Sequence, residues 1–303
     1  MARAQSYPVK PITIVVPFAA GGPVDADTRR YAARLYEMTG QPVVIDNKPG
    51  AGTSIGAAYV AKAKPDGYTL LSNSSAFAVF PAFYKDLKFD PLNDLAPVTL
   101  MHVLLSVLMT PPASPIRSFP DYRAYTRANP DKLSYGTSGV GDVSHLSAVW
   151  MHAIAKSKVT FVPYKGNGPM MIDLLAGRVD VGSASLVQAL PHIRAGRLRA
   201  LAVRGATRVK PLPDIPAVNE HAGMQAFSHE NWQGVFAPTG LPASVMSRLH
   251  GLLTAILKQP EVVAELESQA STPVGNSPAA FRTVISEEIG LWKKVVAETG
   301  IAP

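Results

Sequence analysis

Short apolar runs alternate with stretches of helical spacing along most of the chain. In the first hundred residues the apolar runs are 12–16, 43–45 and 68–71, and the helical stretches between them are 26–39 and 55–63. Strands that alternate with helices in this way form βαβ units. The pattern therefore predicts parallel sheets covered by helices.

Two longer apolar runs are followed by proline and mark changes in this pattern. Residues 102–110 read as one long strand before a proline-rich stretch at 111–115, and residues 230–238 read as another that ends at a proline. Beyond them the spacing predicts helices at 244–270, broken by one internal proline, and at 278–299. We interpret the two long strands as the points where the chain crosses between domains.

These crossings divide the chain into two lobes. We expect residues 5–103 to begin the first lobe and residues 229–303 to complete it, with residues 104–228 inserted as the second lobe. A length of 303 residues and a hydrophobic content of 47% are ample for packed cores of this size.

The turn after the first predicted strand is the strongest candidate for a binding site. The chain continues there as Pro17-Phe18-Ala19-Ala20-Gly21-Gly22 and then enters a helix. Free N–H groups at a helix start bind anions, and the small residues leave the amides of 19–22 uncovered, with Phe18 as an aromatic that could cover a ligand. The alternative is plain strand-to-helix punctuation. Asp25 would oppose an anion, so we interpret it as the N-terminal charge of the helix or as an acceptor for a bound water.

A second turn of the same design lies downstream at 135–145. Its glycines permit unusual backbone angles, and its hydroxyl groups can donate charge-assisted hydrogen bonds to a carboxylate. His145 lies seven residues before His152, but this spacing without a nearby carboxylate does not predict a metal site. The candidates in this turn are Thr137, Ser138, Gly139, Ser144 and His145.

The composition and the motifs of the chain favour some classes of function and exclude others. The 29 basic and 22 acidic residues give a net charge of +7, but no run of Lys and Arg exceeds two residues, which favours an anionic small molecule over nucleic acid. The absence of cysteine excludes disulfides and cysteine nucleophiles. The glycine-rich stretch 50–56 lacks the acidic partner of a dinucleotide site at the end of the next strand, so we expect no such cofactor. No Gly-Lys-Ser/Thr phosphate loop and no His-Glu-x-x-His zinc motif is present.

Six separated motifs occur in order within residues 8–297 of the chain. They are Pro17-Phe18-Ala19-Ala20-Gly21-Gly22-x-x-Asp25, Pro49-Gly50-Ala51-Gly52, Pro65-Asp66-Gly67-Tyr68-Thr69-Leu70, Tyr135-Gly136-x-Ser138-Gly139, Pro163-Tyr164-Lys165-Gly166 and Gly196-x-Leu198-Arg199-Ala200-Leu201-Ala202-Val203. In this set and order the chain resembles the solute-binding receptors of tripartite tricarboxylate transporters, the Bug family.

The resemblance implies an α/β, two-lobed periplasmic-binding-protein fold. Each lobe would be a mostly parallel sheet flanked by helices, and the ligand would lie in the interlobe cleft. Backbone amides and waters would hold a carboxylate between the two turns, and more variable positions would contact the far end of the ligand. The expected ligand-binding residues are Phe18, Ala19, Ala20, Gly21, Gly22, Asp25, Ser74, Ser75, Thr137, Ser138, Gly139, Ser144, His145, Ser183 and Ser185.

One segment departs from the pattern of that family. After Gly177-Arg178-Val179-Asp180-Val181 the family often continues with a large apolar residue and an Asp or Asn, whereas this chain reads Gly182-Ser183-Ala184-Ser185. Small hydroxyl residues widen that wall and remove an acidic group, which disfavours a ligand with a free ammonium. We expect an organic mono- or dicarboxylate, aromatic or aliphatic.

The resemblance also implies a secreted, periplasmic, monomeric protein that delivers its ligand to membrane permease subunits, without catalysis, metal or cofactor. Ala2-x-Ala4 has the spacing of a signal-peptidase site, although an apolar segment before it is absent. The apolar stretch 98–109 is too short for a spanning helix. Two alternatives stay open: an enzyme on the same scaffold, and a sensor that presents its liganded form to a membrane partner.

Overall fold

The structure is a computed structural model that describes residues 7–84, 87–139, 143–205, 207–227 and 231–301. The chain splits into two compact units. The predicted cleavage motif, the lobe boundary predicted at residue 228 and residues 140–142 of the second turn lie outside the described residues. Unit 1 contains Met1–Val103, Trp232–Glu267 and Thr272–Val296; unit 2 contains Leu104–Asn231, Ser268–Ser271 and the residues from Ala297.

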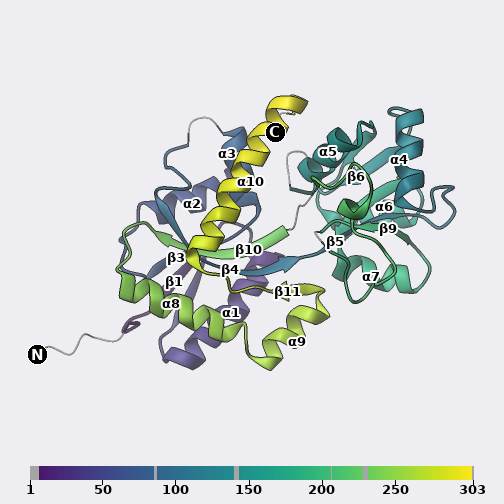
Figure 1. The fold of residues 1–303 in the computed structure, drawn as a ribbon. Helices are drawn as coiled ribbons and strands as arrows, with labels where there is room; N and C mark the ends of the chain where they lie inside the picture. The colour runs from purple at the N-terminus through teal and green to yellow at the C-terminus, as the bar shows by residue number, and fades with distance from the viewer. Residues whose placement is uncertain (1–6, 85–86, 140–142, 206, 228–230, 302–303) are drawn as a thin grey trace, which may run out of the picture. The chain divides into compact units, whose positions relative to one another are not determined.

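Unit 1 is built on a six-stranded sheet with the order β11-β4-β10-β3-β1-β2 (Figure 1). β1 pairs in parallel with both β2 and β3, and β10 pairs antiparallel with β3, so the sheet is mixed. The strands are β1 (Ile12–Val16), β2 (Val43–Asn47), β3 (Thr69–Ser74), β4 (Leu95–Leu104), β10 (Asn231–Pro238) and β11 (Ser271–Pro273).

Helices cover both faces of this sheet. Apolar side chains of α1, α8 and α9 form one buried cluster with the strands, and α1 and α8 lie side by side (Figure 1). Aromatic rings from α3, β10 and α10 pack together as a second cluster. The ring centroids of Phe77 and Phe236 lie 4.4 Å apart, and those of Trp232 and Phe281 lie 5.1 Å apart. The helices are α1 (Pro23–Thr39), α2 (Ser54–Ala61), α3 (Ala76–Phe83), α8 (Ala243–Ile256), α9 (Pro260–Ser268) and α10 (Pro278–Thr299), with the 3-10 turn η1 (Ala51–Thr53).

Unit 2 is built on a five-stranded sheet with the order β7-β6-β8-β5-β9. β6 pairs in parallel with β7 and β8, whereas β5 pairs antiparallel with β8 and β9. The strands are β5 (Ser106–Thr110), β6 (Ser134–Thr137), β7 (Thr160–Pro163), β8 (Val181–Ser185) and β9 (Arg199–Val203).

The helices of unit 2 also lie on both faces of its sheet. Side chains of α6 and α7 form a buried apolar cluster with β5, β8 and β9. The rings of Tyr122 on α4 and Tyr135 on β6 both contact the ring of His152 on α5, which places α4 and α5 at the face that carries Tyr135. The helices are α4 (Phe119–Ala128), α5 (Val143–Ala155), α6 (Asn167–Leu175) and α7 (Leu186–Arg194), with the 3-10 turn η2 (Val218–Glu220).

The structure corrects two predicted elements. The run 102–110 is not one strand: β4 ends at Leu104, β5 begins at Ser106, and the two strands belong to different sheets. The first helix begins at Pro23, three residues earlier than predicted, because proline is well accommodated in the first turn of a helix. Among the described helices, none is both long and apolar enough to cross a membrane.

Candidate functional site

The turn predicted in unit 1 follows β1 directly and leads into α1. Ser74 is the last residue of β3 and Ser75 follows it. Because β3 lies beside β1 in parallel, these residues and the turn lie at the same edge of the sheet. In open α/β sheets the carboxyl ends of parallel strands are the usual place for a ligand. Gly21 has a φ of 80°, a backbone angle that favours glycine.

Asp25 holds this turn in place. One carboxylate oxygen accepts hydrogen bonds from the Gly21 N–H at 2.8 Å and from Arg29 Nε at 2.9 Å, and the other accepts from Asn47 Nδ2 at 2.9 Å. The Arg29 hydrogen bond is the largest cause that lowers the pKa of Asp25 to about 2; burial opposes it, and the bonds from Gly21 and Asn47 reinforce it. Asp25 is therefore an ionised brace for the turn.

The hydrogen bonds within the turn, including those to Asp25, limit which of its backbone N–H groups are available to a ligand. The Gly21 N–H is used by Asp25, and the Gly22 N–H donates to the Ala19 carbonyl at 3.3 Å. The N–H groups of Ala19 and Ala20 make no hydrogen bond to the described part of the chain, and both residues are exposed. Phe18 is half-buried, and its carbonyl accepts from Asn47 Nδ2 at 3.1 Å. Two adjacent donors are thus left for a ligand.

Ser74 and Ser75 are less open than the sequence suggests. Ser74 is half-buried and its hydroxyl accepts from the Ala76 N–H at 3.3 Å, while Ser75 is 1% exposed. Beside them, Gln233 Nε2 donates to the hydroxyls of Ser72 at 3.0 Å and Thr28 at 3.1 Å. Sequence reasoning missed this buried polar cluster because its members come from β3, α1 and β10.

The stretch Gly52-Thr53-Ser54-Ile55-Gly56 matches the Gly-x-Ser-x-Gly spacing of a hydrolase nucleophile. That chemistry needs the serine on a sharp turn directly after a strand, but Ser54 follows η1, and β2 has already ended at Asn47. The Ser54 hydroxyl makes no hydrogen bond to the described residues. A Cβ on Gly56 would lie 2.9 Å from Pro17 Cβ, so this glycine serves close packing beneath the turn.

The second predicted turn follows β6 in unit 2. Ser144 Oγ accepts from the Ser138 N–H at 3.1 Å and lies 2.8 Å from Ser138 Oγ, while the Ser138 carbonyl accepts from the Gly166 N–H at 2.8 Å. Gly139 is half-buried. Thr137 is 1% exposed, and its hydroxyl has no hydrogen-bond partner in the described part of the chain. An unpartnered buried hydroxyl at the end of a strand is a candidate ligand contact.

The two histidines of α5 do not form a metal site. The ring of His145 packs edge-on against Phe161 at 4.9 Å, and the His152 ring nitrogens lie 2.8 Å from Tyr122 Oη and 2.8 Å from Ser157 Oγ. Burial, followed by the charge of Arg204, lowers the pKa of His152 to about 3. Within the described residues no cluster of His, Asp and Glu could hold a metal ion.

The small-residue segment at the end of β8 contacts a residue that the sequence analysis did not single out. Ser183 is 2% exposed, and its hydroxyl lies 2.9 Å from Tyr135 Oη and 2.6 Å from Arg204 Nη1. Ser185 is half-buried and its hydroxyl donates to Gln188 Oε1 at 3.2 Å. The sequence signal for Arg204 is a charged residue placed directly after the apolar run 201–203.

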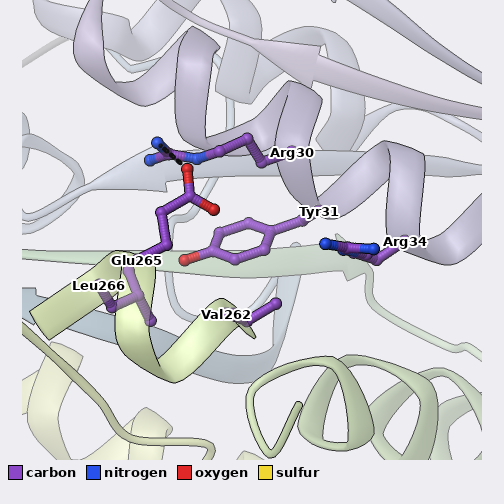
Figure 2. A pocket seen from close by; sticks show the side chains of 6 residues that line it. All are labelled: Arg30, Tyr31, Arg34, Val262, Glu265 and Leu266. Atoms are coloured by element: carbon purple, nitrogen blue, oxygen red, sulfur yellow. Dashed lines mark hydrogen bonds and ion pairs between the residues drawn. The ribbon is translucent and has the colours of Figure 1, made fainter. Parts of the chain in front are cut away.

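A separate pocket in unit 1 lies between α1 and α9 and is lined by basic, acidic, aromatic and aliphatic side chains (Figure 2). Arg30 Nη1 bonds to Glu265 at 2.7 Å, and Arg34 Nη1 bonds to Glu37 at 3.0 Å. Because these cations are already paired with carboxylates, the pocket is a poor anion site.

Comparison with known proteins shows the family of the chain. The family described as "Tripartite tricarboxylate transporter family receptor" matches residues 28–301. The chain belongs to this family. It is 35% identical over 299 residues to Protein BugT of Bordetella pertussis, which covers 98% of this chain and 91% of that protein.

Solved structures of the same kind match nearly the whole chain. The R. palustris protein Rpa4515, solved with adipate, is 35% identical with a TM-score of 0.81, covering 98% of this chain and 99% of that one. MatC (Rpa3494) from Rhodopseudomonas palustris, solved with bound malate, is 32% identical with a TM-score of 0.78, covering 96% and 100%. The α/β fold of a solute-binding receptor in this family is therefore shared by the chain.

Proposed function

We propose that this chain is a periplasmic receptor that binds a small organic dicarboxylate and delivers it to the permease subunits of a tripartite transporter, without chemical change to the ligand. The observation that carries the proposal is the pair of N–H groups of the exposed residues Ala19 and Ala20, which have no hydrogen-bond partner among the described residues, in a turn that Asp25 holds through the Gly21 N–H. Adjacent amides in a fixed turn bind an anionic oxygen well.

The second turn is proposed to supply the other contacts. Thr137 offers a buried hydroxyl without a partner among the described residues, and the next residue, Ser138, has its hydroxyl 2.8 Å from that of Ser144. Hydrogen bonds to a carboxylate are stronger than those between neutral groups. Relatives solved with adipate and malate support a ligand with two acidic groups. The receptor is proposed to act as a monomer.

The proposal is tested by thermal shift and calorimetry with adipate, malate and benzoate, using adipamide as an uncharged control. A ligand at about 100 times its dissociation constant raises the free energy of unfolding by about 2.7 kcal/mol, which is a clear increase in Tm. Adipate or malate is expected to give this shift and adipamide is not. Equal binding of acid and amide, or no binding of any acid, contradicts the proposal.

Recovery of the ligand separates a receptor from an enzyme. After incubation for hours at stoichiometric protein, the adipate or malate that bound should be recovered unchanged by mass spectrometry. A new product would replace the receptor proposal with the enzyme alternative.

A further inference from the structure

Arg204 is a buried arginine in unit 2 whose partners are neutral. It directly follows β9, is 3% exposed, and donates its backbone N–H to the Ser106 carbonyl at 2.8 Å. Its Nη1 donates to Ser183 Oγ at 2.6 Å, and its Nη2 donates to Ser147 Oγ. Its guanidinium lies 5.8 Å from the centre of the Phe227 ring.

No carboxylate forms an ion pair with Arg204 among the described residues, and its Nε has no hydrogen-bond partner there. Two arginines on the surface of the chain differ, because Arg29 is paired with Asp25 at 2.9 Å and Arg208 with Glu220 at 2.8 Å. A buried charge is costly unless an opposite charge compensates it. The lack of a negative charge beside Arg204 in the described part of the chain therefore needs an explanation.

The sheet places Arg204 beside the candidate site of unit 2. Arg204 lies opposite Ser106 on β5, and Ser106 lies opposite Ser185 on β8, so these residues share one face at the carboxyl end of β8. Ser183, two residues before Ser185, is on the same face and contacts Tyr135 Oη at 2.9 Å. The charge therefore lies under the end of β8, on the face that carries Tyr135.

Thr137 is the second, independent sign of a ligand at this place. It lies two residues after Tyr135 on β6 and therefore on the same face, and β6 pairs in parallel with β8 through Gly136 and Gly182. The next position in that register sets Thr137 beside Ser183. Thr137 is 1% exposed, and its hydroxyl has no partner among the described residues. A buried cation directly after β9 and a donor at the end of β6 without a partner in the described chain thus lie on the same face of the sheet, both beside Ser183 of β8.

We propose that Arg204 is a specificity-determining residue. It lies beneath Ser183 and Thr137 and supplies the positive charge by which unit 2 favours an acidic group of the ligand over its neutral isostere. This inference rests on the proposed function. Arg204 is a positioning residue rather than a direct contact, because its Nη atoms already bond to Ser183 and Ser147. Its charge acts through a weakly screened interior, where one charge changes anion affinity by about tenfold or more at neighbouring distances.

The alternative is that Arg204 only ties α5 to β8 through Ser147 and Ser183. The two roles differ in what they predict for acid and amide ligands. Loss of a structural tie would weaken the binding of both ligand forms by the same factor. Loss of the charge would weaken the acid and leave the amide unchanged.

The experiment measures dissociation constants by calorimetry for adipate with adipamide and for malate with malamide. The variants are Arg204→Met, which keeps the length without the charge, and Arg204→Lys, which keeps the charge. Arg199→Met is the matched control, because Arg199 also lies on β9 but donates to the backbone carbonyls of Pro112, Ser114 and Ile116.

In Arg204→Met the preference for acid over amide is expected to fall about tenfold. In Arg204→Lys the preference should stay within about threefold of that of the unmodified protein. In Arg199→Met the preference should be unchanged. An unchanged preference in folded Arg204→Met, or an equal loss in Arg199→Met, overturns the inference. Where circular dichroism shows that Arg204→Met does not fold, Arg204→Lys decides, because loss of the preference with the charge retained also overturns it. Failure of the unmodified protein to bind either diacid counts against the proposed function instead.

Discussion

Each of the two turns is held by a side chain from the helix that follows it, but the chemistry of that side chain differs. In unit 1 the turn after β1 is held by Asp25, which accepts the Gly21 N–H at 2.8 Å. In unit 2 the turn after β6 is held by Ser144, which accepts the Ser138 N–H at 3.1 Å. In each case a side chain from the first turn of the following helix accepts a backbone donor. One brace is ionised and the other is neutral, and the difference decides how firmly each turn is fixed.

The charged residues near Asp25 and near Ser144 also differ. The carboxylate of Asp25 is balanced by Arg29, so the turn of unit 1 carries an internal ion pair and leaves the Ala19 and Ala20 amides to a ligand. Unit 2 has hydroxyls at its turn and Arg204 beneath it, without an acidic partner in the described residues. We infer that unit 1 attracts an anion by rigid backbone donors, and unit 2 by hydroxyl groups and a buried charge.

The largest effect expected from this comparison is on stability. Asp25→Ala removes the acceptor of three charge-assisted hydrogen bonds and should lower the free energy of unfolding by about 3 kcal/mol. Ser144→Ala removes a neutral acceptor and should cost about 1 kcal/mol. Urea unfolding followed by circular dichroism measures both changes.

Asp25→Asn is the control for charge, because the amide keeps an oxygen that can accept from Gly21. Its cost should lie between those of the two alanine variants. Equal costs for Asp25→Ala and Ser144→Ala would show that the ionised brace is no firmer than the neutral one.

The next effect concerns pH, because each unit contains a buried neutral histidine. Burial, together with the charge of Arg30, lowers the pKa of His102 in unit 1 to about 4, although Asp27 lies 3.5 Å away; that carboxylate is itself paired with Arg30. Burial lowers the pKa of His152 in unit 2 to about 3. Below pH 6.5 the unfolded chain binds protons that the folded chain does not, so stability falls as pH falls.

Between pH 7 and pH 5 each histidine should cost about 2 kcal/mol of unfolding free energy. The pKa of Asp25, at about 2, lies below this range and leaves the slope unchanged. His102→Gln and His152→Gln should each remove one part of the slope, measured as Tm against pH. A slope that neither variant reduces would mean that neither histidine is kept neutral by its unit.

Much of the fold could be predicted from local pattern. The strand at 12–16 and the helix at 278–299 match β1 and α10 at both ends, because a sharply bounded apolar run and a proline start leave little choice. The run 102–110 could not be divided correctly. An apolar run shows that a segment is buried, but it does not show that the chain leaves one sheet at Leu104 and enters another at Ser106.

The candidate site was predictable where it depends on glycine and small residues, and not where it depends on tertiary contacts. The two turns were visible as short segments, yet the role of Asp25 requires Asn47 from the next strand. Arg204 was not predicted, since its meaning depends on Ser147 and Ser183, which are far from it in the chain. The assignment of every predicted ligand-binding residue, in both units, to a ligand site stays a prediction.

The smallest effect tests the donors of unit 1 alone. Ala20→Pro deletes one exposed N–H that has no partner in the described chain, and Ala20→Ser keeps it. Loss of one charge-assisted hydrogen bond should weaken adipate or malate binding by about tenfold, or about 1.5 kcal/mol, whereas Ala20→Ser should change it by less than about threefold. Proline can also distort the turn. The affinities of the two variants are therefore compared only if their Tm values are equal, which indicates that Asp25 still holds Gly21. Calorimetry that finds the same affinity in both variants would remove the Ala20 amide from the site and leave unit 2 as the main source of anion binding.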